Sequence, residues 1–121
     1  MATAKQFEEL IIWQESRLLI KELYLLFEKN KDFSFRDQIQ RAAVSIMNNI
    51  AEGFERDSKP DFIKFLFYSK SSCGEVRSML YLALDLKYIS QIEFDEMNKK
   101  TLKLSVGIYK LIKYLTTLTK K

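Results

Sequence analysis

Apolar residues recur every three or four positions along most of the chain, the pattern of amphipathic helices. The period is clearest over residues 91–119, where one apolar row alternates steps of three and four and a second row flanks it. Such a row is typical of the seam along which antiparallel helices pack. Its members are Phe94, Met97, Thr101, Leu104, Ile108, Leu111, Leu115 and Leu118.

A capping signal marks the start of each of four segments. In each segment a Ser or Thr is followed three positions later by an acid or amide, so that the two residues can cap each other's backbone N–H groups. The pairs are Thr3 with Gln6, Ser34 with Asp37, Ser58 with Asp61, and Ser90 with Glu93. With the apolar periods that follow, they predict helices over approximately 4–29, 35–53, 59–88 and 91–119.

Two glycines have predicted structural roles. Gly53 follows the second apolar period and is expected to end that helix in the left-handed conformation. Gly74 lies inside the third predicted helix, where glycine costs about 1 kcal/mol relative to alanine. We expect Gly74 to mark a place where two helices approach closely.

Composition favours a single all-α domain over residues 1–121. This length is enough for one hydrophobic core, and 3 glycines and 1 proline leave little sequence for β-turns or long loops. Short loops between long helices favour antiparallel neighbours, so we predict an up-down-up-down four-helix bundle. Three of the helices carry more than one apolar stripe, which another subunit usually covers. We therefore predict a homo-oligomer.

The residue types limit the chemistry of the chain. Histidine is absent and Cys73 is the only cysteine, which excludes catalytic triads with histidine, His-ligated zinc and thiolate metal sites. We expect no catalytic residue, no metal and no cofactor, hence no enzyme. The N-terminus has no apolar signal region, and the apolar runs are shorter than the ~20 residues of a membrane span. We expect a cytoplasmic protein with no membrane partner.

A polar row lies beside the apolar row of the second predicted helix, and the third helix has a polar break. If these helices pair about the loop between them, Arg41 and Glu75 lie within about one turn of each other, and serine hydroxyls surround them. We predict a buried polar network that fixes helix register, forms a pocket for a ligand or partner, or presents a catalytic carboxylate at Glu52 or Glu75. Its members are Arg41, Ser45, Asn49, Glu52, Ser72 and Glu75.

A basic face follows the last predicted helix. The formal net charge is +4 and the pI is about 9.1, and the acids of this helix lie in its first turns. Acids first and bases last complement the helix dipole, so a solvated face is one interpretation. The other is a row of phosphate contacts to nucleic acid. The lysines are Lys99, Lys100, Lys103, Lys110 and Lys113.

Three stretches of the chain resemble one known family: FEELIIWQESRLLIKELYLL, QIQRAAVSIMNNIAEGFER and FIKFLFYSKSSCGEVRSMLYLALDLKYIS. They are similar to the four-helix-bundle proteins encoded in intervening sequences of bacterial 23S rRNA genes, over nearly the whole chain. The motif SI-x-x-NIAEG and a later S-x-x-E carry the resemblance, and Val76 is a minor departure from it. The matching residues are Arg41, Ser45, Ile46, Asn49, Ile50, Ala51, Glu52, Gly53, Ser72 and Glu75.

The resemblance implies a four-helix bundle that assembles into a ring, as a homopentamer. The accessory proteins of diversity-generating retroelements look like the same fold, and they bind a reverse transcriptase and nucleic acid. The intervening-sequence proteins themselves have no established activity. The resemblance therefore implies the fold in more detail than the function.

These observations predict a non-enzymatic, oligomeric helical bundle that binds nucleic acid, structured RNA in particular, through its basic face. The nucleic acid can be RNA or DNA, because phosphate contacts do not distinguish them. The alternative is a protein-interaction scaffold or accessory subunit that engages a partner protein and has no nucleic-acid binding of its own.

Overall fold

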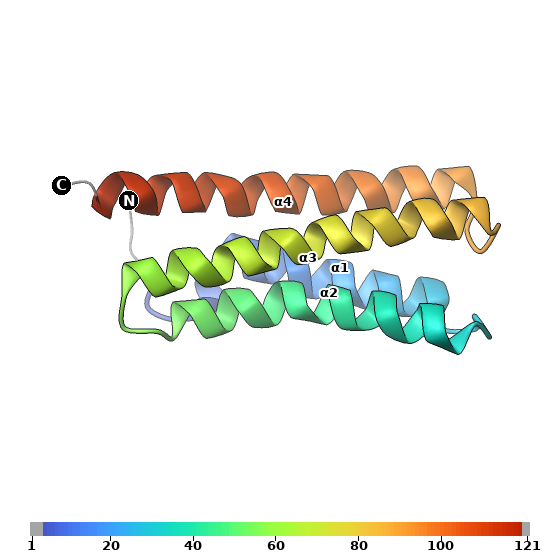
Figure 1. The fold of residues 1–121 in the computed structure, drawn as a ribbon, viewed down its shortest axis with the longest axis horizontal. Coiled ribbons are helices and arrows are strands. Elements are labelled where there is room, and N and C mark those ends of the chain that lie inside the picture. Colours follow the sequence, from blue (N-terminus) through green and yellow to red (C-terminus); the bar gives the residue numbers. More distant parts are fainter. Residues whose placement is uncertain (1–3, 120–121) are drawn as a thin grey trace.

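The computed structural model describes residues 4–119, and this part of the chain is all helical, without a strand. A short 3-10 helix, η1 (Phe7–Glu9), precedes four α-helices. Figure 1 shows that successive helices run in opposite directions, as the sequence predicts for a four-helix bundle. Within residues 4–119, no helix is long and apolar enough to cross a membrane. The helices are α1 (Ile11–Phe27), α2 (Phe33–Phe54), α3 (Lys59–Asp85) and α4 (Gln91–Thr119).

The predicted starts of the last two helices are confirmed by their capping bonds. The Ser58 hydroxyl accepts a hydrogen bond from the Asp61 N–H at 3.2 Å, which begins α3 at Lys59. Ser90 and Glu93 cap each other before α4, through bonds of 3.1 and 2.9 Å. Both caps are formed by residues three positions apart, so the local sequence is enough to predict them.

The first two starts differ from the prediction. Thr3 lies outside the described residues, and an extended residue, Leu10, separates η1 from α1. Asp32, not Ser34, is the N-cap of α2: its carboxylate accepts a hydrogen bond from the Phe35 N–H at 3.1 Å. Helix α3 ends at Asp85 because Lys87 takes the left-handed conformation, with a φ of 61°.

The core is formed by the inward apolar rows of all four helices. Helix α2 packs against α1 and α3, and α4 packs against α3 and α1. Side chains from every helix are fully buried, as the predicted period requires. The largest of them include Leu23, Phe27, Ile39, Ile46, Ile50, Leu66, Leu80, Leu104, Ile108 and Ile112.

The predicted roles of Gly53 and Gly74 are both wrong. No glycine has a positive φ, and Gly53 is a buried residue inside α2. A Cβ at Gly53 would lie only 2.6 Å from the Cβ of Phe65, so this glycine permits the close approach of α2 and α3. Gly74 instead faces open space, with nothing within 4 Å of the position its Cβ would take. The sequence pattern does not show which helix lies opposite a glycine.

The end of the bundle opposite the α2–α3 loop is joined by an aromatic cluster and one hydrogen bond. The rings of Phe27, Phe35 and Tyr88 form successive edge contacts with centroids 5.4 and 5.3 Å apart. The Tyr88 hydroxyl donates to the Asp32 carboxylate at 2.7 Å. This bond lowers the pKa of Asp32, with a smaller effect from the Phe35 N–H, and it raises the pKa of Tyr88. It ties the α3–α4 loop to the start of α2.

We predict opposite effects of alanine at the two glycines. Gly53→Ala lowers the free energy of unfolding by about 1–3 kcal/mol, because overpacking against Phe65 exceeds the gain in helix propensity. Gly74→Ala, the matched control, raises it by about 0.5–1 kcal/mol. Urea unfolding followed by circular dichroism measures both. Equal stabilisation by the two substitutions would contradict a close approach at Gly53.

We also predict a pH-dependent effect of Tyr88→Phe. The lowered pKa of Asp32 makes its contribution present above an unfolded pKa of ~3.9 and lost as the pH falls below it. The raised pKa of Tyr88 makes its contribution present below ~10 and lost as the pH rises through the folded pKa. The variant should therefore have a lower urea midpoint than wild type near pH 7, with a smaller difference at both extremes.

Tyr24→Phe is the control for this experiment. Tyr24 is an exposed tyrosine of α1, and its hydroxyl bonds to no residue that the structure describes. Its removal should leave the urea midpoint unchanged across the pH range. A Tyr88→Phe difference that stays constant from acid to alkaline pH would contradict the assigned role of the Asp32–Tyr88 bond.

Candidate nucleic-acid interface

Small polar side chains line the contact between α2 and α3. The hydroxyl oxygens of Ser45 and Ser72 are 2.6 Å apart, and the Asn49 amide donates to the Ser45 carbonyl at 2.8 Å. Ser69, which the sequence analysis did not include, is fully buried and donates to the Ile46 carbonyl at 2.7 Å. The Ser45–Ser72 and Ser69–Ile46 bonds join α2 to α3 and fix the register of the two helices, since each hydroxyl requires its partner to stay in place, whereas the Asn49 bond lies within α2.

The charged members of the predicted polar network lie outside this seam. Arg41, Glu52 and Glu75 are all exposed in the single chain, and Arg41 forms no ion pair with Glu75. Glu52 pairs instead with Arg56 on the surface, at 3.4 Å. The helices pair as expected, but these three side chains leave from the outer flank of the seam rather than from its centre. A buried network that includes them is therefore not present within the chain.

The five predicted lysines of α4 fall into two groups. Lys100 bonds to Glu22 of α1 at 2.9 Å and to Glu96 at 3.1 Å, and these bonds raise its pKa. Lys103 lies 3.6 Å from Glu15 of α1. The other three are exposed and form no ion pair within residues 4–119; they are Lys99, Lys110 and Lys113.

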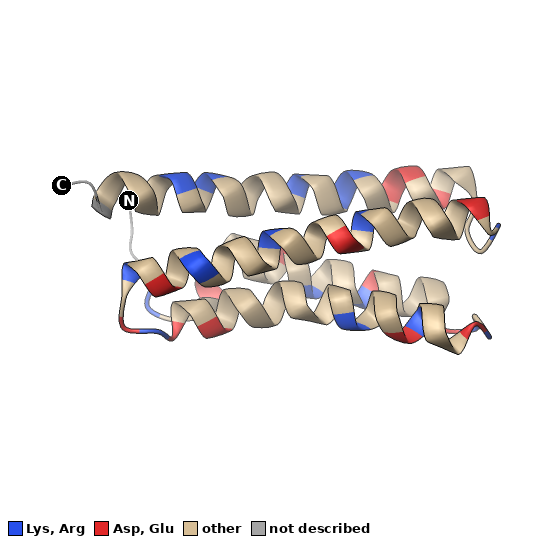
Figure 2. Ribbon diagram, in the orientation of Figure 1, with Lys and Arg blue, Asp and Glu red and all other residues tan. Residues whose placement is uncertain are grey.

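The unneutralised lysines belong to two stretches of α3 and α4 that contain no acid. In α4 no acidic residue follows Glu96, and in α3 none lies between Asp61 and Glu75. Figure 2 shows the red bands of α4 gathered at its beginning, and only blue bands along the remainder. We call these two stretches, 62–74 and 97–119, the basic face. They contain Lys64, Lys70, Lys99, Lys100, Lys103, Lys110 and Lys113.

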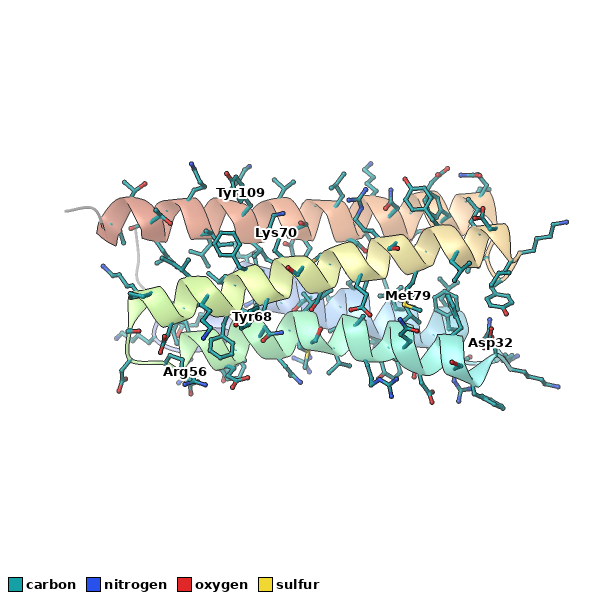
Figure 3. All side chains as sticks on the ribbon, viewed as in Figure 1. Asp32, Arg56, Tyr68, Lys70, Met79 and Tyr109 are labelled. Atoms are coloured by element: carbon teal, nitrogen blue, oxygen red, sulfur yellow. The ribbon has the colours of Figure 1, made fainter. Side chains whose placement is uncertain are left out.

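An exposed aromatic ring lies within the basic face, and the sequence analysis did not identify it. The Tyr109 side chain is 44% exposed. The ammonium nitrogen of Lys70 lies 5.9 Å from the centre of its ring and that of Lys113 lies 6.0 Å away. Figure 3 shows Lys70 and Tyr109 side by side where α3 meets α4. The helical spacing of Tyr109 and Lys113 was available from sequence, but the approach of Lys70 depends on how the helices pack.

The lone thiol and the carboxylates are the other reactive groups of residues 4–119. Burial raises the pKa of the Cys73 thiol to about 12, so the thiol stays protonated at neutral pH. No group of three acidic or cysteine side chains placed to hold a metal ion occurs within residues 4–119. The chemistry of this surface is that of ammonium groups and the exposed phenol rings of Tyr68, Tyr109 and Tyr114.

Comparison with known proteins agrees with the resemblance. The family model of the 23S rRNA-intervening sequence protein matches residues 8–116. A crystal structure of a protein of unknown function from the S23 ribosomal protein family of Bacteroides thetaiotaomicron is similar in fold, with a TM-score of 0.79 and 25% identity. The match covers 85% of this chain and 99% of that protein. No curated protein matches the chain. The chain belongs to the family of 23S rRNA-intervening sequence proteins.

Proposed function

We propose that this protein is a non-enzymatic, oligomeric helical bundle that binds nucleic acid, structured RNA in particular, through the basic face. The observation that carries this proposal is the charge of the surface: the two stretches that form it contain seven lysines and no acid. Phosphate contacts need such a surface, since each lysine that neutralises a phosphate releases a counterion.

The ion pairs of α1 restrict where the phosphates bind. Lys100 and Lys103 already have carboxylate partners on α1, so a phosphate would have to compete with Glu22 and Glu15. Lys110 and Lys113 have no such competitor within the described residues. We therefore place the main phosphate contacts at the C-terminal half of α4, around Lys110 and Lys113.

Exposed apolar residues of α1 support the oligomeric part of the proposal. Ile11, Leu18 and Leu25 follow one another at steps of seven and are 70, 63 and 57% exposed. Apolar residues at this spacing lie on one side of a helix, and a row of this length on the surface is typical of a subunit contact. A second copy of the chain is our proposed partner, in the homopentamer that the family resemblance implies. Assembly would repeat the basic face and increase its avidity.

A protein-interaction scaffold is the second candidate function. Arg41 and Glu75 favour it, because both are exposed without an ion pair although they flank the ordered α2–α3 seam. A partner protein with complementary charges would satisfy both groups. This candidate predicts binding that does not depend on Lys110 and Lys113.

We predict that Lys110→Glu/Lys113→Glu abolishes binding to a labelled RNA hairpin. Fluorescence anisotropy at several salt concentrations measures the affinity. Wild-type binding should weaken as salt rises, and the two phosphate contacts of Lys110 and Lys113 should contribute about 1.4–1.8 to the slope of log affinity against log salt. Lys29→Glu/Lys31→Glu is the matched control: it also lowers the formal net charge from +4 to 0, but on exposed positions outside the basic face and outside the apolar row of α1.

The two double variants separate RNA binding by the basic face from attraction of RNA by the net charge. If only the variant in the basic face loses binding, the local surface and not the total charge is responsible. Equal losses in both would show that the protein attracts RNA through its net charge alone. Wild-type protein that ignores the hairpin at every salt concentration would overturn the proposed function.

We predict that Leu18→Glu dissociates the oligomer. A buried carboxylate in the α1 row would carry a desolvation cost that the contact between copies cannot offset. Native mass spectrometry should show an oligomer for wild type, with five subunits expected, and monomers for the variant. Ile92→Glu is the control, since Ile92 is 78% exposed but lies outside the row. A monomeric wild type would contradict the proposed assembly.

A further inference from the structure

We propose that Tyr109 is a stacking platform for an unpaired base, with Lys70 and Lys113 as the cations that hold the adjacent phosphates. The inference rests on the proposed function and narrows it: the ligand of this part of the basic face is a single-stranded segment of nucleic acid. In a structured RNA, such a segment is a loop, a bulge or an end.

The first argument is the position of the two cations. Lys70 comes from α3 and Lys113 from α4, yet both ammonium nitrogens lie within about 6 Å of the centre of one ring. Neither lysine has a carboxylate partner within residues 4–119. The ring is therefore beside two unneutralised positive charges, in the arrangement by which single-strand-binding surfaces combine backbone contacts with base stacking.

The second argument comes from the other exposed tyrosines. Tyr81 packs against Phe94 at 4.7 Å, and Tyr68 packs against Phe65 at 5.6 Å, so part of each ring already has an aromatic neighbour. Tyr109, like Tyr24 and Tyr114, is exposed and has no aromatic neighbour within the described residues, but of these three only Tyr109 has lysine ammonium groups within about 6 Å of its ring. A base can therefore supply the aromatic contact that Tyr109 lacks.

The third argument concerns the form of the ligand. Bases inside a duplex are stacked on one another, so an exposed ring on a protein surface gains nothing from them. An unpaired base presents its face to the ring, and such a stack forms with any of the bases. The lysines alone would bind single strands and duplexes alike, whereas Tyr109 adds affinity for single strands only.

The test compares three labelled oligonucleotides by fluorescence anisotropy, with the full-length protein. They are a single strand of mixed sequence, the same strand in a duplex, and an abasic strand with the same number of phosphates. Tyr109→Leu should weaken binding of the single strand roughly 5- to 150-fold, the range for loss of one stacked base. Binding of the duplex and of the abasic strand should stay within about twofold of wild type.

Two further variants separate stacking from general damage. Tyr109→Phe keeps the ring and should bind the single strand as wild type does. Tyr24→Leu removes another exposed tyrosine, on α1 and outside the basic face, and should change none of the three affinities. Circular dichroism of each variant shows whether the bundle remains folded.

The outcomes distinguish this inference from the proposed function. If Tyr109→Leu binds the single strand as tightly as wild type, or weakens all three ligands equally, the stacking inference is overturned. The proposed function then still stands, provided that Lys110→Glu/Lys113→Glu abolishes binding. If the wild-type protein binds none of the three oligonucleotides at low salt, both fail together. A photocrosslink from a halogenated uridine in the bound strand to Tyr109 would support the inference in the unmodified protein.

Discussion

The close approach of α2 and α3 is the constraint on which the rest of the bundle depends. Gly53 leaves room for Phe65, and hydroxyl contacts at Ser69 and Ser72 fix the register of the seam. Within residues 4–119 no buried side-chain oxygen or nitrogen lacks a hydrogen-bond partner, so the polar seam carries no unpaired group. On the side of α3 that meets α4, the ammonium nitrogen of Lys70 lies 5.9 Å from the centre of the Tyr109 ring. Helix α3 thus contributes both to the polar seam with α2 and to the surface that we propose as functional.

The sequence predicts the fold well where the deciding contacts are local. The caps at Ser58 and Ser90 bond to residues three positions away, and both helix starts were predicted correctly. Asp32 was missed because Ser34 fits the capping pattern as well, while the bond that holds Asp32 comes from Tyr88, 56 residues further along the chain. The helix pattern can therefore be predicted from one segment. The choice between Asp32 and Ser34 as the N-cap also involves Tyr88, from a distant part of the chain.

The same distinction applies to the candidate site. The period of α4 was enough to find its lysine row, because all five lysines belong to one helix. It was not enough to show that α1 supplies carboxylates to Lys100 and Lys103 and leaves Lys110 unneutralised. The exposure of Tyr109 could not be predicted from the sequence either, since an aromatic residue beside an apolar row is usually part of the core. The positions of the lysines on a helix can be predicted from its sequence. Their ion pairs with carboxylates of other helices depend on how the helices pack.

The helix dipole does not account for the basic face. Acids at the start of α4 and lysines after them fit a dipole, but this effect is confined to the first and last turns of a helix. Lys99 and Lys103 lie near the middle of α4, and Lys70 lies near the middle of α3, where the dipole gives no preference for a cation. A solvated surface would also tolerate acids among these lysines, and such pairs stabilise a helix by about 0.2–0.5 kcal/mol each. Helix stability alone therefore favours a mixture of charges here, so it does not explain the absence of acids from both stretches.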